Sequence, residues 1–181
     1  MTQETQSLQT SINGEDAACA VSDASLEKIN IYEIGAYQAL VRFERFVEGS
    51  ANDLLMVISS ASLPDHSRQA IESSAERLGL GGSRISWTSI LGRESGDEPI
   101  PMSSQNLHLL IESIDPAAII VTDIGAMSVL SEAYGIGLEA DSSNRVACRT
   151  CATFSDFDTM LSDPDAKQKA WRVLKSLSLE L

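Results

Sequence analysis

Short apolar runs that alternate with helical patterns constrain the fold of this chain more than any other feature. Residues 54–58 and 117–122 are continuous apolar segments of strand length, which is typical of strands buried on both faces of a sheet. Four strands are expected in all, at 54–58, 85–91, 117–122 and 145–153. Five helical patterns surround them, at 26–47, 64–80, 107–114, 123–133 and 164–177. This alternation predicts an α/β fold with a parallel sheet covered by helices on both faces.

Several of the helical patterns carry start signals. Ser25 is placed to cap a helix that begins near residue 26, and after a break at Gly35 an apolar helical face continues from Ala36 to Val47. Asp123 can cap the helix that follows the third strand. Asp163 is placed to cap the last helix, with Pro164 at its first position, where the missing N–H costs nothing.

The composition bounds the class of protein. A length of 181 residues with 43% hydrophobic residues suits one soluble domain, and no apolar run approaches the ~20 residues of a membrane helix. The formal net charge is −13, so the field of the whole molecule repels nucleic acid. We therefore expect a cytoplasmic protein with no membrane association and weak or absent direct binding to DNA.

The first 25 residues differ in composition from the rest. They contain no Lys or Arg, no apolar periodicity and no secretory signal, which predicts a disordered or loosely docked leader. Its short apolar piece at 17–21 is either part of that leader or a partner-binding segment. Residues 26–181 are expected to form a single domain.

The end of the chain has a more particular pattern. Met160 and Leu161 are expected in a loop before the last helix, and the framework then continues at fixed spacing through Pro164, Lys167, Trp171 and Leu174. This order resembles the C-terminal motif of the uracil-DNA glycosylase superfamily. The resemblance implies a three-layer α/β/α sandwich with a central four-stranded parallel sheet, in which ligands bind outside the carboxyl ends of the strands.

The same resemblance marks pocket positions at these strand ends. After the first strand, Ser59 and Ser60 stand in the loop where the family has its water-positioning residue, with Ser60 aligned to that residue. Asp156 occupies the position of the histidine that stabilises the departing uracil anion, and Asp158 that of a serine. Asp123 replaces a glycine after the third strand. A neutral serine is a poor general base, a carboxylate at position 156 opposes a developing anion, and a capping role explains Asp123. None of these five residues is therefore predicted to be catalytic.

The remaining reactive side chains have ordinary explanations. His66 falls in the first turn of a helix and is expected to face solvent rather than to serve Ser60 as a base. Cys148 and Cys151 form the only Cys-x-x-Cys pair, and two thiols cannot complete a zinc or iron–sulfur site. We expect buried small residues there, with a redox pair as the alternative. No metal and no cofactor are predicted.

Three functional hypotheses follow. The first is a non-catalytic protein of glycosylase fold that serves as a protein-binding or assembly module, with a partner in DNA replication or repair. The psi subunits of bacterial DNA polymerase III are similar in kind, since they resemble this fold, lack the active site and bridge the clamp loader. The second is a divergent DNA glycosylase or other base-processing hydrolase that uses Ser60 and Asp123 as substitutes. The third is an acidic DNA mimic or inhibitor.

Overall fold

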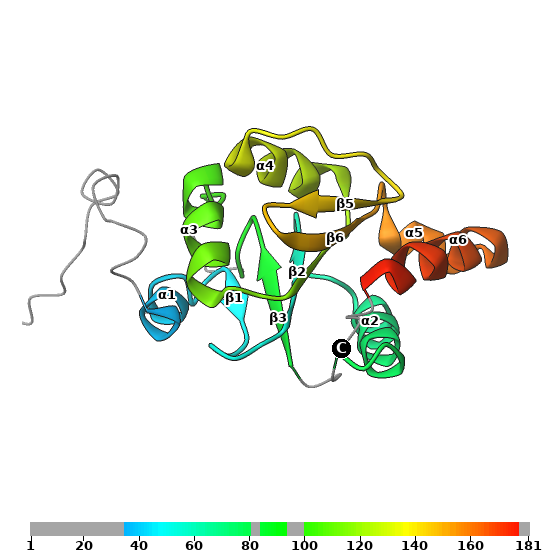
Figure 1. Ribbon diagram of the computed structural model, residues 1–181, viewed down its shortest axis with the longest axis horizontal. Coiled ribbons are helices and arrows are strands. Elements are labelled where there is room, and N and C mark those ends of the chain that lie inside the picture. The colour runs from blue at the N-terminus through cyan, green and yellow to red at the C-terminus, as the bar shows by residue number, and fades with distance from the viewer. Residues whose placement is uncertain (1–34, 81–83, 94–99, 178–181) are drawn as a thin grey trace, which may run out of the picture.

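A β-sheet lies between two groups of helices in the computed structural model of the chain, which describes residues 35–80, 84–93 and 100–177 (Figure 1). Along the chain its elements are α1 (Ala36–Arg42), β1 (Val47–Glu48), β2 (Leu55–Ser59), α2 (Asp65–Arg77), β3 (Ile85–Ser89), α3 (Ser104–Ile114), β4 (Ala118–Val121), α4 (Ile124–Tyr134), β5 (Ser142–Val146), β6 (Arg149–Thr153), α5 (Phe157–Ser162), α6 (Pro164–Leu174) and the 3-10 helix η3 (Lys175–Leu177). The expected leader at 1–25 and the expected helix start at Ser25 lie outside the described residues.

The α/β class is confirmed, but the sheet has six strands rather than the expected four, in the order β1-β3-β2-β4-β6-β5. The strands β3, β2, β4 and β6 run parallel to one another. The two additional strands, β1 and β5, pair antiparallel to β3 and β6 at the two edges of the sheet. Both were hidden inside segments to which the sequence pattern assigned another structure.

Val47 corrects the first of these assignments. The helical spacing of its neighbours predicted that Val47 lies on a helix, but α1 ends at Arg42 and the chain turns through Phe43. Val47 then pairs with Thr88 of β3. Its side chain is buried in either structure, so the apolar pattern alone could not distinguish the helix from a short edge strand.

The expected fourth strand at 145–153 is instead a hairpin of β5 and β6. The two strands pair from Val146↔Arg149 outward to Ser142↔Thr153. Ala147 lies in the turn with φ 52°, a left-handed conformation that alanine rarely adopts. Because no Gly, Asn or Pro marks this turn, the reversal of the chain was not predictable from residue type.

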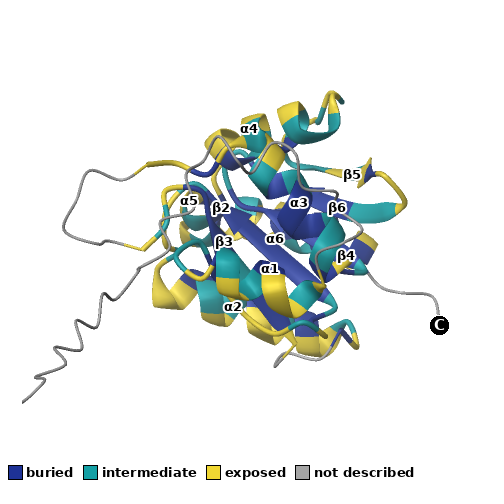
Figure 2. Cartoon of the chain, turned by 90° about the vertical axis from the view of Figure 1, so that its left-hand side faces the viewer, coloured by how far each residue is buried: buried dark blue, intermediate teal, exposed yellow. Residues whose placement is uncertain are grey.

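Each strand contributes alternate side chains to two separate cores, as the pleat of a sheet requires. Met56 and Ile58 of β2 face the cluster that includes residues of α1, α3 and α4. Leu55 and Val57 face the cluster that includes residues of α2, α5 and α6. All five residues of β2 are buried, which confirms the expected strand buried on both faces. Figure 2 shows the dark-blue strands inside helices whose outer faces are exposed.

The C-terminal segment has one helix more than expected. Met160 and Leu161, expected in a loop, belong to the short helix α5. The closing helix α6 begins as predicted: Asp163 Oδ2 accepts a hydrogen bond from Ala166 N–H at 2.7 Å, and Pro164 is its first residue. The two consecutive caps, Asp156 for α5 and Asp163 for α6, explain why the chain can turn between helices so closely spaced.

Candidate functional site

The carboxyl ends of the parallel strands meet at one edge of the sheet, where Asp123 ties two segments together. It directly follows β4 and caps α4, since its Oδ1 accepts a hydrogen bond from Ala126 N–H at 2.9 Å. Its Oδ2 accepts a hydrogen bond from Ser60 N–H at 2.8 Å, and the Ser60 hydroxyl also donates to this carboxylate. Asp123 therefore holds the loop after β2 against the first turn of α4.

This contact fixes the side chain of Ser60. Its hydroxyl donates to a carboxylate of the same chain, and a Cβ added to Gly125 would overlap Ser60 Oγ. A carboxylate is too weak a base to deprotonate an alcohol at neutral pH without further help. Ser60 is thus arranged to hold its loop in place rather than to activate water.

Asp156 is the second acid at this edge and lies exposed at the start of α5. It accepts hydrogen bonds from Thr159 N–H at 3.0 Å and from the Thr159 hydroxyl at 2.7 Å. The bond from the Thr159 N–H, and to a lesser extent that from the hydroxyl, holds the pKa of Asp156 below its usual value. Its backbone forms an isolated antiparallel bridge with Asp123. The carboxylate therefore stays ionised where the resemblance expects a departing anion, which would oppose that chemistry.

Asp158 lies on the other side of α5 and connects this helix to α2. His66 Nε2 lies 2.8 Å from Asp158 Oδ1, and the Ser67 hydroxyl donates to the same oxygen at 2.5 Å. Because Ser67 donates to the carboxylate rather than to His66, the three side chains do not form the relay of a hydrolase triad. His66 is exposed, as expected, and its partner is Asp158 rather than Ser60.

Ser59 borders a hollow of about 260 Å³ at the carboxyl ends of β2 and β3. Its hydroxyl donates to Thr88 O at 3.3 Å. The two arginines of this hollow are already engaged: Arg68 pairs with Glu48 at 3.0 Å and lies 4.7 Å from the Trp87 ring, and Arg93 donates to two backbone carbonyls. The hollow therefore offers no guanidinium that is free of protein partners among the residues described.

The five sequence-predicted positions thus separate into three groups. Ser60, Asp123 and Asp156 come together at the strand ends. Ser59 faces the hollow beside β3, and Asp158 faces α2. Within the described part of the chain, no group of three or more His, Cys, Asp or Glu side chains is arranged to hold a metal ion.

Sequence reasoning missed a larger groove of about 370 Å³ between α2, α5 and α6. Ala70, Trp171 and Leu174 contribute to its apolar lining, and Arg77 and Lys167 are also among its lining residues. The signal that could have found it is the C-terminal motif itself. Of the motif residues, Leu161, Lys167, Trp171 and Leu174 all line this groove.

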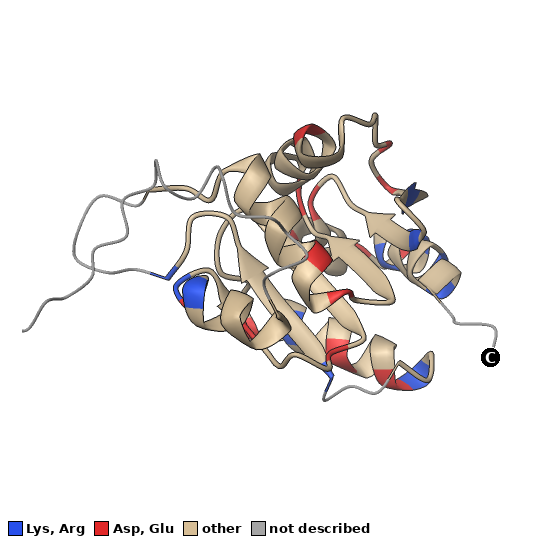
Figure 3. Ribbon diagram, turned by 60° about the vertical axis from the view of Figure 1, so that its left-hand side comes forward, with Lys and Arg blue, Asp and Glu red and all other residues tan. Residues whose placement is uncertain are grey.

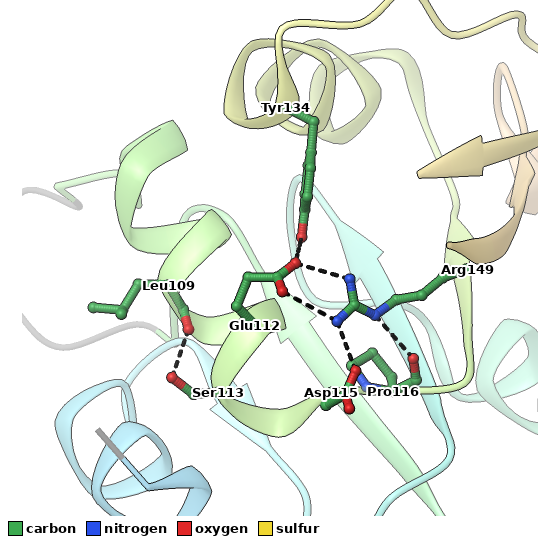
Figure 4. Close-up of polar contacts among 7 residues, drawn as sticks. All are labelled: Leu109, Glu112, Ser113, Asp115, Pro116, Tyr134 and Arg149. Carbon is green, nitrogen blue, oxygen red and sulfur yellow. Dashed lines mark hydrogen bonds and ion pairs between the residues drawn. The ribbon is translucent and has the colours of Figure 1, made fainter. Parts of the chain in front are cut away.

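A polar cluster stands at the opposite edge of the sheet, where the parallel strands begin (Figure 4). Arg149, the first residue of β6, contacts Glu112 at 2.8 Å and Asp115 at 2.7 Å, and the Tyr134 hydroxyl donates to Glu112 at 2.6 Å. Burial alone would raise the pKa of Glu112, but the hydrogen bonds from Arg149 and Tyr134 outweigh it and lower that pKa. The cluster joins α3, α4 and β6, so its role is to hold these elements together.

The Cys-x-x-Cys pair is divided between two environments. Cys151 lies in β6 and is fully buried, which raises the pKa of its thiol to about 12. Cys148 is exposed in the turn of the hairpin, so the expectation that both thiols are buried is wrong for this residue. Because Cys151 is buried, its thiol is unreactive in the folded protein, which does not favour a redox pair.

The described acidic residues are spread over both groups of helices, from Glu112 and Glu132 on one side to Glu72 and Asp165 on the other (Figure 3). No helix in the described part of the chain is long and apolar enough to cross a membrane. In comparisons with known proteins, the sequence matches no protein-family model, and no curated protein matches it.

Proposed function

We propose that this protein is a non-catalytic relative of the uracil-DNA glycosylases that serves as a protein-binding or assembly module in DNA replication or repair. Two observations support the fold part of the proposal. The resemblance in the C-terminal motif implies a central block of four parallel strands, and β3, β2, β4 and β6 are such a block. Helices lie on both faces of that block.

The hydrogen bonds of Asp123 are the main support for the proposal that the protein has no glycosylase activity. The carboxylate caps α4 and accepts both the backbone N–H and the hydroxyl of Ser60. The Thr122 hydroxyl also donates to Asp123 Oδ2, at 3.2 Å. A water molecule that was to attack a sugar carbon would have to displace these bonds, which would uncap the helix and release the loop after β2. The residues best placed to act as substitutes in a divergent glycosylase are thus engaged in holding the fold.

The charge of the chain supports a protein partner rather than DNA. A formal net charge of −13 makes direct contact with phosphates unfavourable unless basic residues gather on one surface. The spread of acids over both groups of helices likewise does not favour an acidic DNA mimic, which needs its acids on one face. An assembly module needs neither arrangement, because its partner is bound by contacts between protein surfaces.

The test is affinity purification of the tagged chain from its native host, with chemical cross-linking before lysis and the tag alone as control. We expect co-purifying proteins of the replication or repair machinery, cross-linked to described lysines of this chain. A protein that elutes alone at every concentration, without cross-links to those proteins, would contradict the assembly role. Release of uracil from DNA by the purified chain would contradict the absence of catalysis.

A further inference from the structure

We propose that the groove between α2, α5 and α6 is the docking site for an acidic amphipathic peptide segment of a partner protein. The proposal deepens the assembly role proposed above and rests on it. The groove is built from residues that recur on one face of α2, from one face of α5 and from the turn-spaced residues of α6. A groove between helices is a typical binding site for a helical segment that inserts its apolar face.

The apolar lining of the groove determines which side chains the bound segment can insert. Leu161 and Trp171 line it and are only partly buried, whereas Leu174 lines it from within the buried cluster between the sheet and α2, α5 and α6. Its volume is about 370 Å³. A cavity of about 150 Å³ holds one benzene-sized group, so the groove has room for about two large apolar side chains. We therefore infer a segment with two neighbouring anchors, such as Leu and Phe one helical turn apart.

The charged residues that line the groove determine the sign of the charge that the bound segment should carry. The chain has 26 acidic and 13 basic residues, yet no carboxylate side chain lines this groove. Arg77 and Lys167 line it, and neither makes an ion pair with another described residue. By contrast, Arg68, Arg149 and Lys169 each pair with an acid elsewhere on the molecule. Two available cations beside an apolar floor are complementary to an acidic segment and would repel a basic one.

The residues of the C-terminal motif are therefore also residues of the proposed docking site. Lys167 and Trp171 stand at fixed spacing on α6, and both present their side chains to the groove. Trp171 is one of only two tryptophans in the chain. It provides a fluorescent reporter inside the proposed site, while Trp87 lies in the hollow beside β3.

The experiment uses the full chain and a fluorescein-labelled helical peptide of about 16 residues, with Leu and Phe on one face and Glu on the other. Fluorescence anisotropy is expected to show saturable binding that weakens as salt increases. A peptide with Lys in place of each Glu should bind at least about tenfold more weakly. A third peptide, with Ser in place of Leu and Phe, should not bind. Equal binding of the acidic and basic peptides, or no binding of either, overturns the proposal.

Variants then locate the site. Lys167→Glu and Arg77→Glu should each weaken binding of the acidic peptide by about three- to tenfold. Arg172→Glu is the matched control, because it makes the same change of charge on α6 but lies outside the groove. It should leave the affinity within about twofold. An equal loss in all three variants would show only the effect of net charge and would refute the groove as the site.

A direct readout completes the test. In a Trp87→Phe background, Trp171 is the sole tryptophan, and its emission should shift to shorter wavelength as the peptide covers it. Anisotropy that rises without any change in this emission places the peptide elsewhere and refutes the proposal. If native partners are recovered equally well by Lys167→Glu, the groove inference fails while the assembly role stands. If no replication or repair protein is recovered with the unaltered chain, the assembly role fails, whatever the peptide assays show.

Discussion

Replacement of Asp123 by alanine tests whether this carboxylate holds the structure together at the strand ends. The substitution removes the cap of α4, worth about 1 kcal/mol, and two hydrogen bonds to the partly buried Ser60, each worth about 1 kcal/mol or more when a partner is left unsatisfied. We expect Asp123→Ala to lower the free energy of unfolding by about 2–4 kcal/mol.

Asp163→Ala is the matched control for that prediction. Asp163 is also an aspartate at a helix start, but it is exposed, and among the described residues its carboxylate accepts only the Ala166 N–H. Its loss should cost about 1 kcal/mol. Urea unfolding followed by circular dichroism measures both variants, with an unchanged dependence on urea as evidence of a two-state comparison. If Asp123→Ala costs no more than Asp163→Ala, the reasoning that Asp123 ties two segments together is wrong.

Three further predictions concern the rest of the molecule. Arg149→Met should destabilise the fold by about 3 kcal/mol, because Glu112 loses its partner in a partly buried site. Folding lowers the pKa of Glu112, so ionised Glu112 stabilises the folded state. This stabilisation is complete above about pH 4.5 and is lost as the pH falls through the lower pKa of the folded protein. The pH dependence of stability in this range should therefore be smaller in Arg149→Met. Gly49→Ala should cost about 1–3 kcal/mol, since the new Cβ would lie 2.8 Å from a backbone atom of β3. Iodoacetamide should modify Cys148 in the folded protein, and Cys151 only after unfolding.

The two substitutions at Arg149 and Gly49 have matched controls. Arg145→Met removes an exposed arginine whose side chain donates, within the described structure, to the Cys148 carbonyl, and it should change stability by less than about 0.5 kcal/mol. Gly137→Ala should be equally mild, because no atom lies within 4 Å of the added Cβ. Labelling is best read in a Cys19→Ser background. A cost of Arg149→Met no greater than that of Arg145→Met, or labelling of Cys151 in the native state, would contradict the reasoning.

The parts of the fold that were predictable have local causes. Residues 54–58 were recognisable as a buried strand, because the apolar run is continuous, has the length of a strand and is followed by small polar residues. The caps Asp123 and Asp163 were recognisable from residue type and position, and both accept the expected backbone N–H groups. The two edge strands had no such signal. Val47 is apolar in either structure, and Ala147 turns a hairpin without a typical turn residue.

The candidate site was only partly predictable for a related reason. The strand-end positions Ser60, Asp123 and Asp156 follow from the fold, because parallel strands bring their carboxyl ends to one edge. What the sequence could not show is which partner each side chain takes. Asp158 turns to α2, and its contact with Ser67 spans 91 residues of chain. The groove that Lys167 lines depends on three helices that meet only in the folded structure.

A single-turnover assay of uracil release tests whether the protein lacks glycosylase activity. The protein is held in large excess over single-stranded DNA that contains one uracil, and free uracil is measured over many hours beside the Ser60→Ala variant. We predict that neither protein releases uracil above the rate of DNA alone, because Ser60 and Asp123 are hydrogen-bonded to each other. Release by the natural chain that disappears in Ser60→Ala would contradict it and would make the protein a divergent glycosylase.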